Sequence, residues 1–440
     1  MELEEKSVII PLEPARDSSD LTEDRNSKQR DVTDIPPKSS KITNCDLFFL
    51  ILSIITHCTD VGVDINIVFQ YYFHNKLNKL LLTIALILIP SLINTLVSLQ
   101  MYQQDEDEDQ QKNERIKKQS VCIKMCKKIG RFFGIVLTIL FQFTMAQRCI
   151  YSLKYALQSR YYKKKGDRVG QRRYFIKMLK EEQDIALLRV LECFIEAAPQ
   201  QILQLSLFVH DYHGEFSIIS VHQVISIISS FISLAWAMVS YHRSVRLAQV
   251  DKKNIDIIGS VFQFIWYFSI TSSRIATVSA AAVYSSTFVV GACSIHWLVM
   301  TVWTIIESHG LITFCHNKNR PPHMSLTIIE RVKSTLFSCV LGFVYIFIYL
   351  NPEDTSTFYR HLFYYVICFF ENVSASVLIL VTKLPADIDI AKYHYMLSAS
   401  CIIPFILGVI FMIIYYLKYH PSMKHITLHF WRLLKGRYHK

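Results

Sequence analysis

The sequence predicts an all-α protein that crosses a membrane several times, and two observations carry this prediction. Of its 440 residues, 51% are hydrophobic, and the mean hydropathy is +0.27. Ten apolar segments of helical length follow one another, while basic residues gather in the stretches between them. A helix needs about 20 mostly apolar residues to cross the hydrocarbon core of a bilayer, so this pattern is typical of a multi-pass membrane protein.

The apolar segments lie between two polar tails. Residues 1–43 mix charge, Ser and Pro with few aromatics, which predicts a disordered cytoplasmic tail, and residues 419–440 form a short basic tail. The ten segments are 45–73, 80–101, 131–157, 184–209, 217–242, 257–283, 286–312, 334–350, 361–382 and 396–418.

The charges of the connecting loops predict the topology. Loop 102–130 carries seven Lys and Arg residues and loop 158–183 carries nine, so both are expected on the cytoplasmic side. A single apolar segment, 131–157, separates them, and it is therefore predicted to enter and leave on the same side as a re-entrant hairpin. The same reasoning makes 334–350 re-entrant. Eight spanning helices remain, with both termini in the cytoplasm.

This order, two spanning segments, one re-entrant element and two spanning segments, occurs twice. The run Cys193-Phe194-Ile195-Glu196 in the fourth segment matches Cys368-Phe369-Phe370-Glu371 in the ninth, the equivalent segment of the second half. We therefore predict two parallel internal repeats, each with four transmembrane helices and one re-entrant hairpin, covering residues 44–246 and 247–418.

The segment 184–209 is far too polar for an ordinary spanning helix. Four polar residues recur every four positions and so share one helix face: Glu192, Glu196, Gln200 and Gln204. Arg189 lies one turn before Glu192, close enough to pair with it. Pro199 lacks a backbone donor and is expected to kink the helix or free a carbonyl. A charge at bilayer depth costs roughly 2.5–3.5 kcal/mol, so this stripe needs partners or water.

Other ionisable residues also fall within apolar segments. Asp60 and Asp64 share a face of the first segment, one turn beyond His57. The complete set is Asp60, Asp64, Arg148, Arg189, Glu192, Glu196, Arg274, Glu307 and Glu371. Six carboxylates face only three arginines, so some acids must be protonated or touch water. Two interpretations stay open: buried salt bridges that fix helix register, or a polar track through the bilayer.

Several other classes of function find no support in the sequence. The GxGxxG, Walker A, HExxH and GxSxG patterns are missing, and no nucleophile is paired with a base, so an enzyme is not expected. We expect no cofactor and no metal site. The net charge of +11 lies beside apolar segments, which suits anionic lipid headgroups better than nucleic acid.

The run EAAPQQILQ at 196–204 resembles the Glu-x-x-Pro-Gln-x-x-Leu-Gln signature of the XK-related membrane proteins. The fifth segment, with Ser233–Trp236 and Ser240–Arg246, and the acidic first segment are also similar to that family, over roughly 45–420. The resemblance implies two repeats of the kind described above. It also implies phospholipid scrambling at the plasma membrane, where phosphatidylserine is exposed on dying cells for engulfment after caspase cleavage of a tail. Related proteins bind single-span chaperones or lipid-transfer proteins.

The two tetrads of the form Asp-x-x-Asp that caspases cut after lie in the N-terminal tail, and end at Asp20 and Asp34. The tail that follows the tenth segment contains no such tetrad, whereas mammalian members of this kind are cut at the C-terminus. Acidic, Ser-rich tails also produce such tetrads by chance. Caspase control through the N-terminus is therefore one of two interpretations.

The sequence thus predicts a phospholipid scramblase whose intramembrane charges form or brace a path for lipid headgroups. Membrane phospholipids, including phosphatidylserine, are its expected partners. Two other functions fit the same residues: an ion or solute transporter that uses the acidic stripe, and a non-transporting scaffold that recruits a lipid-transfer protein through the basic loops.

Overall fold

A computed structural model of the chain describes residues 42–73, 75, 77–111, 134, 136, 138, 142–210, 218–248, 254–306, 327–350, 358–382 and 394–420. Every regular element in these residues is helical, as predicted. Six helices are long and apolar enough to cross a membrane, with spans at Asp46–Asn66, Thr83–Tyr102, Gln223–Leu247, Ser286–Ile306, Arg360–Val381 and His394–Tyr419. Each of these spans overlaps a segment predicted to cross.

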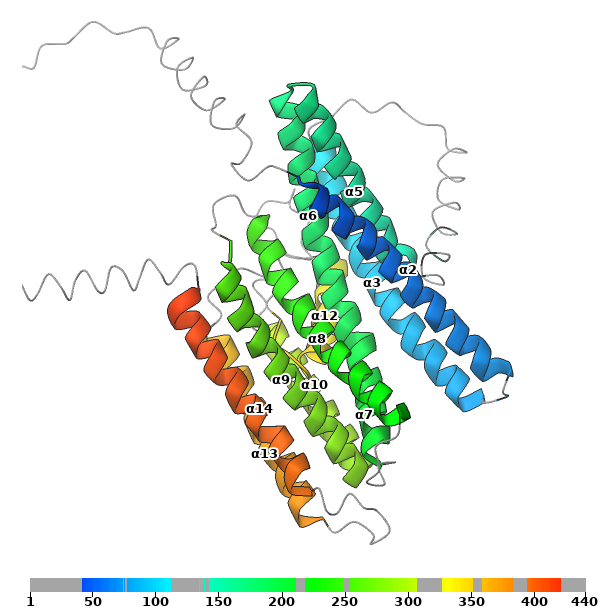
Figure 1. The fold of residues 1–440 in the computed structure, drawn as a ribbon, viewed down its shortest axis with the longest axis vertical. Helices are drawn as coiled ribbons and strands as arrows, with labels where there is room; N and C mark the ends of the chain where they lie inside the picture. The colour runs from blue at the N-terminus through cyan, green and yellow to red at the C-terminus, as the bar shows by residue number, and fades with distance from the viewer. Residues whose placement is uncertain are drawn as a thin grey trace, which may run out of the picture.

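Helices α2 (Asn44–Phe73) and α3 (Leu77–Gln111) form a pair at one side of the bundle (Figure 1). The start of α2 is set by a reciprocal cap. The Thr43 N–H donates to the Asp46 carboxylate at 2.6 Å, and the Asp46 N–H donates to Thr43 Oγ1 at 3.3 Å. Apolar side chains cover the outer face of α2, such as Phe48 and Ile55, which are 60% and 56% exposed. In a bilayer this face contacts lipid.

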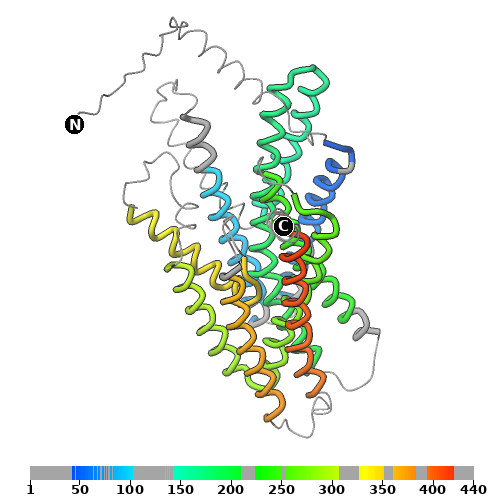
Figure 2. Tube along the Cα trace, turned by 90° about the vertical axis from the view of Figure 1, so that its left-hand side faces the viewer, coloured from blue at the N-terminus to red at the C-terminus, as the bar shows by residue number. Residues whose placement is uncertain are grey.

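Helices α5 (Phe143–Lys164) and α6 (Arg168–Glu192) form a long hairpin. The stretch 158–183, predicted as a loop, is therefore largely helical, because charged residues lower the hydropathy without ending a helix. The turn uses Gly166 at φ +81°, and Asp167 then caps α6 by accepting the Gly170 N–H at 2.9 Å. The hairpin projects beyond the first turn of α2 in both views (Figures 1 and 2).

The polar segment at 184–209 is not a single α-helix. A π-helical turn, Cys193–Ala197, separates α6 from α7 (Ala198–His210), and the Ala198 N–H donates to the carbonyl of Cys193. Pro199 follows at once; it has no N–H to donate to the preceding turn, and its ring would clash with a regular carbonyl position. The predicted disturbance of the helix by Pro199 is therefore confirmed.

The remaining helices are α8 (Ile218–Leu247), α9 (Ile257–Tyr284), α10 (Ser286–Ile306), α12 (Ile328–Val344), α13 (Phe358–Val381) and α14 (His394–Ile414), which a π-helical turn (Tyr415–Tyr419) prolongs. Helix α9 is central: it packs against α14, α13 and α10 and also against α7 and α8 of the first half. Its fully buried aromatic residues, Trp266 and Tyr267, anchor the large core.

Both segments predicted to be re-entrant contain a helix end inside the protein. Helix α5 begins after Gln142, which is 8% exposed and adopts a left-handed backbone conformation at φ 52°. Helix α12 ends at Val344, and the non-helical residues 345–350 that follow are all buried. Such irregular backbone is tolerated at membrane depth only where protein groups or water satisfy its polar atoms.

Gly408 allows α14 to pack closely on α9. A Cβ at this position would lie 2.7 Å from Ile270 Cγ1 and 3.1 Å from the Ile270 nitrogen. Because the backbone cannot move aside easily, Gly408→Ala should destabilise the protein by about 1–3 kcal/mol. Thermal unfolding of the purified protein in detergent measures this loss. Gly291→Ala in α10 is the control, since nothing lies within 4 Å of its added methyl group; equal stability of the two variants would contradict the close packing.

Candidate functional site

The predicted intramembrane charges gather into three polar groups in the structure. The Arg148 cluster joins α3, α5 and α6, and the Arg274 cluster joins α9, α10 and α13. The His57 cluster lies between α2, the start of α5 and the end of α6. In the first two clusters an arginine pairs with the carboxylates, whereas the carboxylates of the third have no Lys or Arg within ion-pair distance among the described residues, and this difference decides what each can do.

Arg148 is fully buried, and its guanidinium is engaged on every side. Nη1 donates to Glu181 at 3.0 Å and to Asp184 at 2.6 Å. The Nε and Nη2 groups donate to the side chain and carbonyl of Ser98, each at 2.9 Å. The Tyr102 ring covers the cation, with its centroid 3.9 Å from Cζ. Two carboxylates and a ring therefore compensate the buried charge, and the cluster fixes three helices together.

Arg274 is 3% exposed and is just as fully bonded. It donates to Glu371 at 2.7 Å, to the Asn372 side chain at 2.8 Å and to the carbonyl of Ile346 at 3.0 Å. The ion-pair partner of Arg274 is thus Glu371, in the second half of the chain. Through Ile346 the cluster also holds the non-helical segment 345–350, which would otherwise leave a buried carbonyl unpaired.

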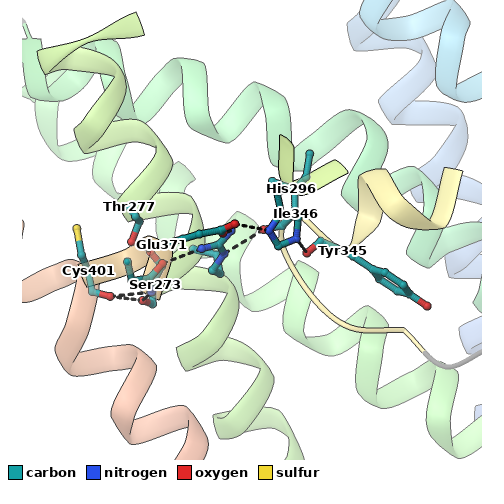
Figure 3. A network of polar contacts seen from close by, with 9 residues as sticks. Ser273, Thr277, His296, Tyr345, Ile346, Glu371 and Cys401 are labelled. Atoms are coloured by element: carbon teal, nitrogen blue, oxygen red, sulfur yellow. Dashed lines mark hydrogen bonds and ion pairs between the residues drawn. The ribbon is translucent and has the colours of Figure 1, made fainter. Parts of the chain in front are cut away.

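His296, from α10, completes the Arg274 cluster (Figure 3). Its Nδ1 lies 2.6 Å from Glu371 Oε1 and its Nε2 lies 2.8 Å from the carbonyl oxygen of Tyr345. A carbonyl oxygen only accepts, so Nε2 carries a proton and donates it to Tyr345. His296 and Arg274 therefore clamp two successive carbonyls of the same non-helical segment. Sequence reasoning missed His296, because a lone histidine in an apolar segment has no distinguishing pattern.

Asn372 is 1% exposed, and its amide donates to Ser273 at 3.1 Å and to the Cys401 carbonyl at 3.0 Å. The run Asn372-Val373-Ser374 has the form of an N-glycosylation acceptor, but Asn372 lies inside the protein, where no glycan fits. Asn372 follows Glu371 in the sequence. A search for charged residues in apolar segments missed it, because its side chain is uncharged.

His296, Cys368 and Glu371 also place a nitrogen, a sulfur and an oxygen within 4.8 Å of one another, a combination that suits a transition metal by ligand type. Both oxygens of Glu371 are already engaged, one by His296 and one by the Arg274 cation. The adjacent guanidinium repels a further positive charge. The geometry therefore favours a hydrogen-bonded ion pair at this place over a metal centre.

The His57 cluster is arranged differently. His57 is buried on α2, with Nε2 2.9 Å from the carbonyl oxygen of Gln142 and Nδ1 3.8 Å from Glu192. The Gln142 side chain donates to Asp64 at 3.3 Å. Gln142, at the start of α5, is thus bonded to α2 through both its backbone carbonyl and its side chain. Two of the predicted acids, Asp64 and Glu192, belong to this cluster.

Arg189 does not form the predicted ion pair with Glu192 among the described residues. Its Nη2 donates to Ser53 Oγ at 2.5 Å, across the interface between α6 and α2. Asp60 is exposed, and Asp64, Glu192 and Glu196 keep part of their surface accessible. Within the described ranges, no Lys or Arg lies within ion-pair distance of Asp60, Asp64 or Glu196. We call Asp60, Asp64, Glu192 and Glu196 together the open acidic face.

The predicted stripe stays accessible on both sides of the π-helical turn. Gln200 is partly exposed and Gln204 is exposed, as are parts of Glu192 and Glu196, so all four members retain accessible surface. Gln201 is only 5% exposed, and its side-chain amide donates to the side-chain oxygen of Gln204 at 3.4 Å. Three predicted residues, Glu307, Asp20 and Asp34, lie outside the described residues.

A cavity of about 450 Å³ opens between α2, α6 and α8, toward the end of the bundle where α2 begins. We call it the α2–α6–α8 cavity. Its polar lining residues are Asp46, Ser53, Glu182, Arg189, Ser240 and Ser244. Burial, together with the neighbouring Asp46 carboxylate, raises the pKa of Glu182 to about 7. Glu182 precedes the apolar part of its helix, and sequence reasoning missed it by assigning 158–183 to a loop.

The raised pKa of Glu182 predicts a pH effect on stability. The folded state holds this proton up to about pH 7, whereas the group in an unfolded chain releases it near 4.5. Stability from this group therefore falls as the pH rises from about 4.5 to 7, by at most about 3 kcal/mol. Glu182→Gln should raise the melting temperature at pH 8 and leave it unchanged at pH 4.5. An equal shift at both pH values would contradict this assignment.

Comparison with known proteins is consistent with this architecture. The family model described as XK-related protein matches residues 48–421 of the chain. The chain belongs to the XK-related family. Two similar relatives carry the name Cell death abnormality protein 8. The Caenorhabditis briggsae protein is 27% identical over 399 residues, 89% of this chain and 82% of its own length. The Caenorhabditis elegans protein is 27% identical over 407 residues, 90% and 83% of the two chains.

In this XK-related chain, the signature run at 196–204 spans the end of the π-helical turn and the first two turns of α7. Its proline is the second residue after the turn, and Glu196, Gln200 and Gln204 carry the accessible stripe, whereas Gln201 is buried. The signature therefore describes a local helix distortion that presents polar side chains beside the open acidic face. The predicted resemblance to the family is confirmed.

Proposed function

We propose that this XK-related protein is a phospholipid scramblase, and that lipid headgroups pass along the open acidic face while the acyl chains stay in the bilayer. The single observation that carries the proposal is the contrast between the three clusters. In the Arg148 and Arg274 clusters a buried arginine pairs with the carboxylates, whereas Asp60, Asp64, Glu192 and Glu196 lie at intramembrane positions, partly exposed, and have no Lys or Arg within ion-pair distance among the described residues. Exposed carboxylates in this setting need a polar ligand or water.

The proposed membrane arrangement is two repeats, each with four spanning helices and one re-entrant element, in the plasma membrane and with cytoplasmic termini. The buried helix ends at Gln142 and Val344 support the re-entrant elements. In this arrangement Arg148, Arg189, Arg274 and Glu371 brace the path, and the acids with Gln200 and Gln204 line it.

The proposed biological role is the exposure of phosphatidylserine on dying cells, which marks them for engulfment. Family membership and the name of the two nematode relatives, Cell death abnormality protein 8, support a role in cell death. A single-span chaperone or a lipid-transfer protein would be compatible partners in the family context.

The decisive experiment is a lipid-flipping assay with purified protein in liposomes. Full-length protein and protein lacking the first 34 residues are reconstituted separately, and dithionite quenching reports how much fluorescent lipid changes leaflet. We expect flipping by at least one of the two forms. Quenching that stops at the outer-leaflet fraction for both forms would overturn the proposal.

An ion or solute transporter is the second candidate, because unpaired carboxylates at bilayer depth also suit cations. Voltage clamp of cells that express the protein separates the two. Charge movement that Glu196→Gln abolishes, together with an absence of lipid flipping, would favour transport of ions.

The N-terminal tetrads predict proteolytic control. Executioner caspase should shorten wild-type protein from its N-terminus, because Asp20 and Asp34 end tetrads of the form that these enzymes cut after. Asp34→Ala should prevent the cut after position 34, and Asp20→Ala the earlier one. Gel mobility and N-terminal sequencing measure the result. If the wild-type chain stays intact while a known caspase substrate in the same reaction is cut, the proposed cleavage of the N-terminal tail is contradicted.

A further inference from the structure

The α2–α6–α8 cavity carries charges of both signs in a fixed order. Asp46 and Glu182 face each other from α2 and α6 near the start of α2. Ser53 and Arg189 meet deeper in the bundle, where the guanidinium donates to the hydroxyl. Each deeper residue lies seven positions along its helix from the carboxylate on the same helix, which corresponds to two turns and about 10 Å. The cavity is therefore acidic at its outer end and basic at its inner end.

The chemistry that fits this order is a zwitterion with its cation outward. A glycerophospholipid in the leaflet at this end of the bundle has its acyl chains toward the bilayer centre, its phosphate next, and any headgroup ammonium farthest out. That polarity matches the order of Arg189 and then Asp46 with Glu182. Burial of Glu182 adds to the match, because a buried carboxylate with a raised pKa gains most from a cation beside it.

Resting on the proposed function, we infer that this cavity is the entry site for phospholipids whose headgroup carries an ammonium group, such as phosphatidylethanolamine, phosphatidylserine and phosphatidylcholine. Asp46 and Glu182 bind the ammonium, and Arg189 binds the phosphate. Phosphatidylglycerol, which has a phosphate and no ammonium, is a poor ligand of the site.

The rim of the cavity identifies the occupant as a lipid and not a soluble amine. Phe49 lines the cavity and is 64% exposed, and Leu247, at the opposite edge on α8, is 39% exposed. Both belong to helices that are apolar enough to span a membrane. A ligand that reaches the carboxylates from the side passes apolar side chains, which suits acyl chains that remain in the bilayer.

The test measures binding separately from flipping. Detergent-purified protein is incubated with an equimolar mixture of phosphatidylethanolamine and phosphatidylglycerol of identical acyl chains, and native mass spectrometry reports the ratio of the two bound lipids. We expect wild type to prefer phosphatidylethanolamine by about tenfold. Glu182→Gln should lower that ratio toward one by weakening phosphatidylethanolamine alone. Arg189→Gln should weaken both lipids together, because they share the phosphate.

Asp167→Asn is the matched control. It exchanges a carboxylate for an amide at the exposed tip of the α5–α6 hairpin and keeps a good helix cap, so the lipid ratio should stay at the wild-type value. Asp46→Asn should act like Glu182→Gln, with some added loss of stability because Asp46 also caps α2.

The outcomes separate this inference from the proposed function. Equal binding of the two lipids by wild type, or an unchanged ratio in Glu182→Gln, overturns the entry site even if lipids are flipped. Competition by soluble phosphoethanolamine at the same concentration as the lipid overturns the lipid as occupant. A preference that depends on Glu182, in a protein that flips nothing in liposomes, supports the headgroup site and overturns the scramblase.

Discussion

Arg274→Met should remove about 3 kcal/mol of folding free energy, because it leaves the half-buried Glu371 carboxylate without its cation and removes a buried donor from two further groups. Glu371 would lose the ion pair at 2.7 Å, and the Ile346 carbonyl and the Asn372 oxygen would each lose a donor. Each unpaired buried group adds roughly 1–3 kcal/mol. Fluorescence-detected size-exclusion chromatography after heating should show a large drop in the melting temperature.

A second substitution separates the lost charge balance from the lost volume. Arg274→Met combined with Glu371→Leu should recover part of the stability, since a buried ion pair is replaceable by apolar side chains of similar size. Full recovery is not expected, because His296, Asn372 and Ile346 lose partners as well. A double variant that is less stable than Arg274→Met would contradict the view that the broken ion pair causes most of the lost stability.

The membrane fold was predictable from the sequence because hydropathy and loop charge are one-dimensional signals. Six of the predicted segments contain helices that suit a membrane span. Pro199 predicted a distorted helix, and a π-helical turn lies just before it. The helical structure of the charged residues 158–183 was missed, because the prediction relied on hydropathy alone. They lower the average hydropathy, although the helix continues through them.

The pairing of charges was not predictable, since a helix face says nothing about which other helix it meets. Glu181 and Asp184 bind Arg148, and both lie at the edge of a stretch that had been assigned to a loop. His296 and Asn372 belong to the Arg274 cluster without any pattern in the sequence. Counting six carboxylates against three arginines therefore left out Glu181 and Asp184, the acids that pair with Arg148.

The open acidic face leads to the largest expected functional effect, through Glu196→Lys. A lysine beside Asp64 and Glu192 would supply the ion-pair partner that these acids lack among the described residues, and would convert the face into a paired cluster like that of Arg274. If headgroups use these carboxylates, the flipping rate in liposomes should fall about tenfold or more, which corresponds to about 1.4 kcal/mol in the barrier.

Glu196→Gln is the matched control, because it removes one charge without adding a cation and should slow flipping much less. The melting temperature of both variants should stay near the wild-type value, since Glu196 has no ion-pair partner to lose among the described residues. A wild-type rate in Glu196→Lys would contradict the path.

The two largest predicted effects therefore fall on different measurements. Substitution in the Arg274 cluster should cost stability first, because its charges are already compensated by protein groups. Substitution in the open acidic face should cost rate first, if lipid headgroups pass along its carboxylates as we propose. A stability loss at Glu196 as large as that at Arg274 would show that both faces serve as struts, and would remove the physical basis for a headgroup path.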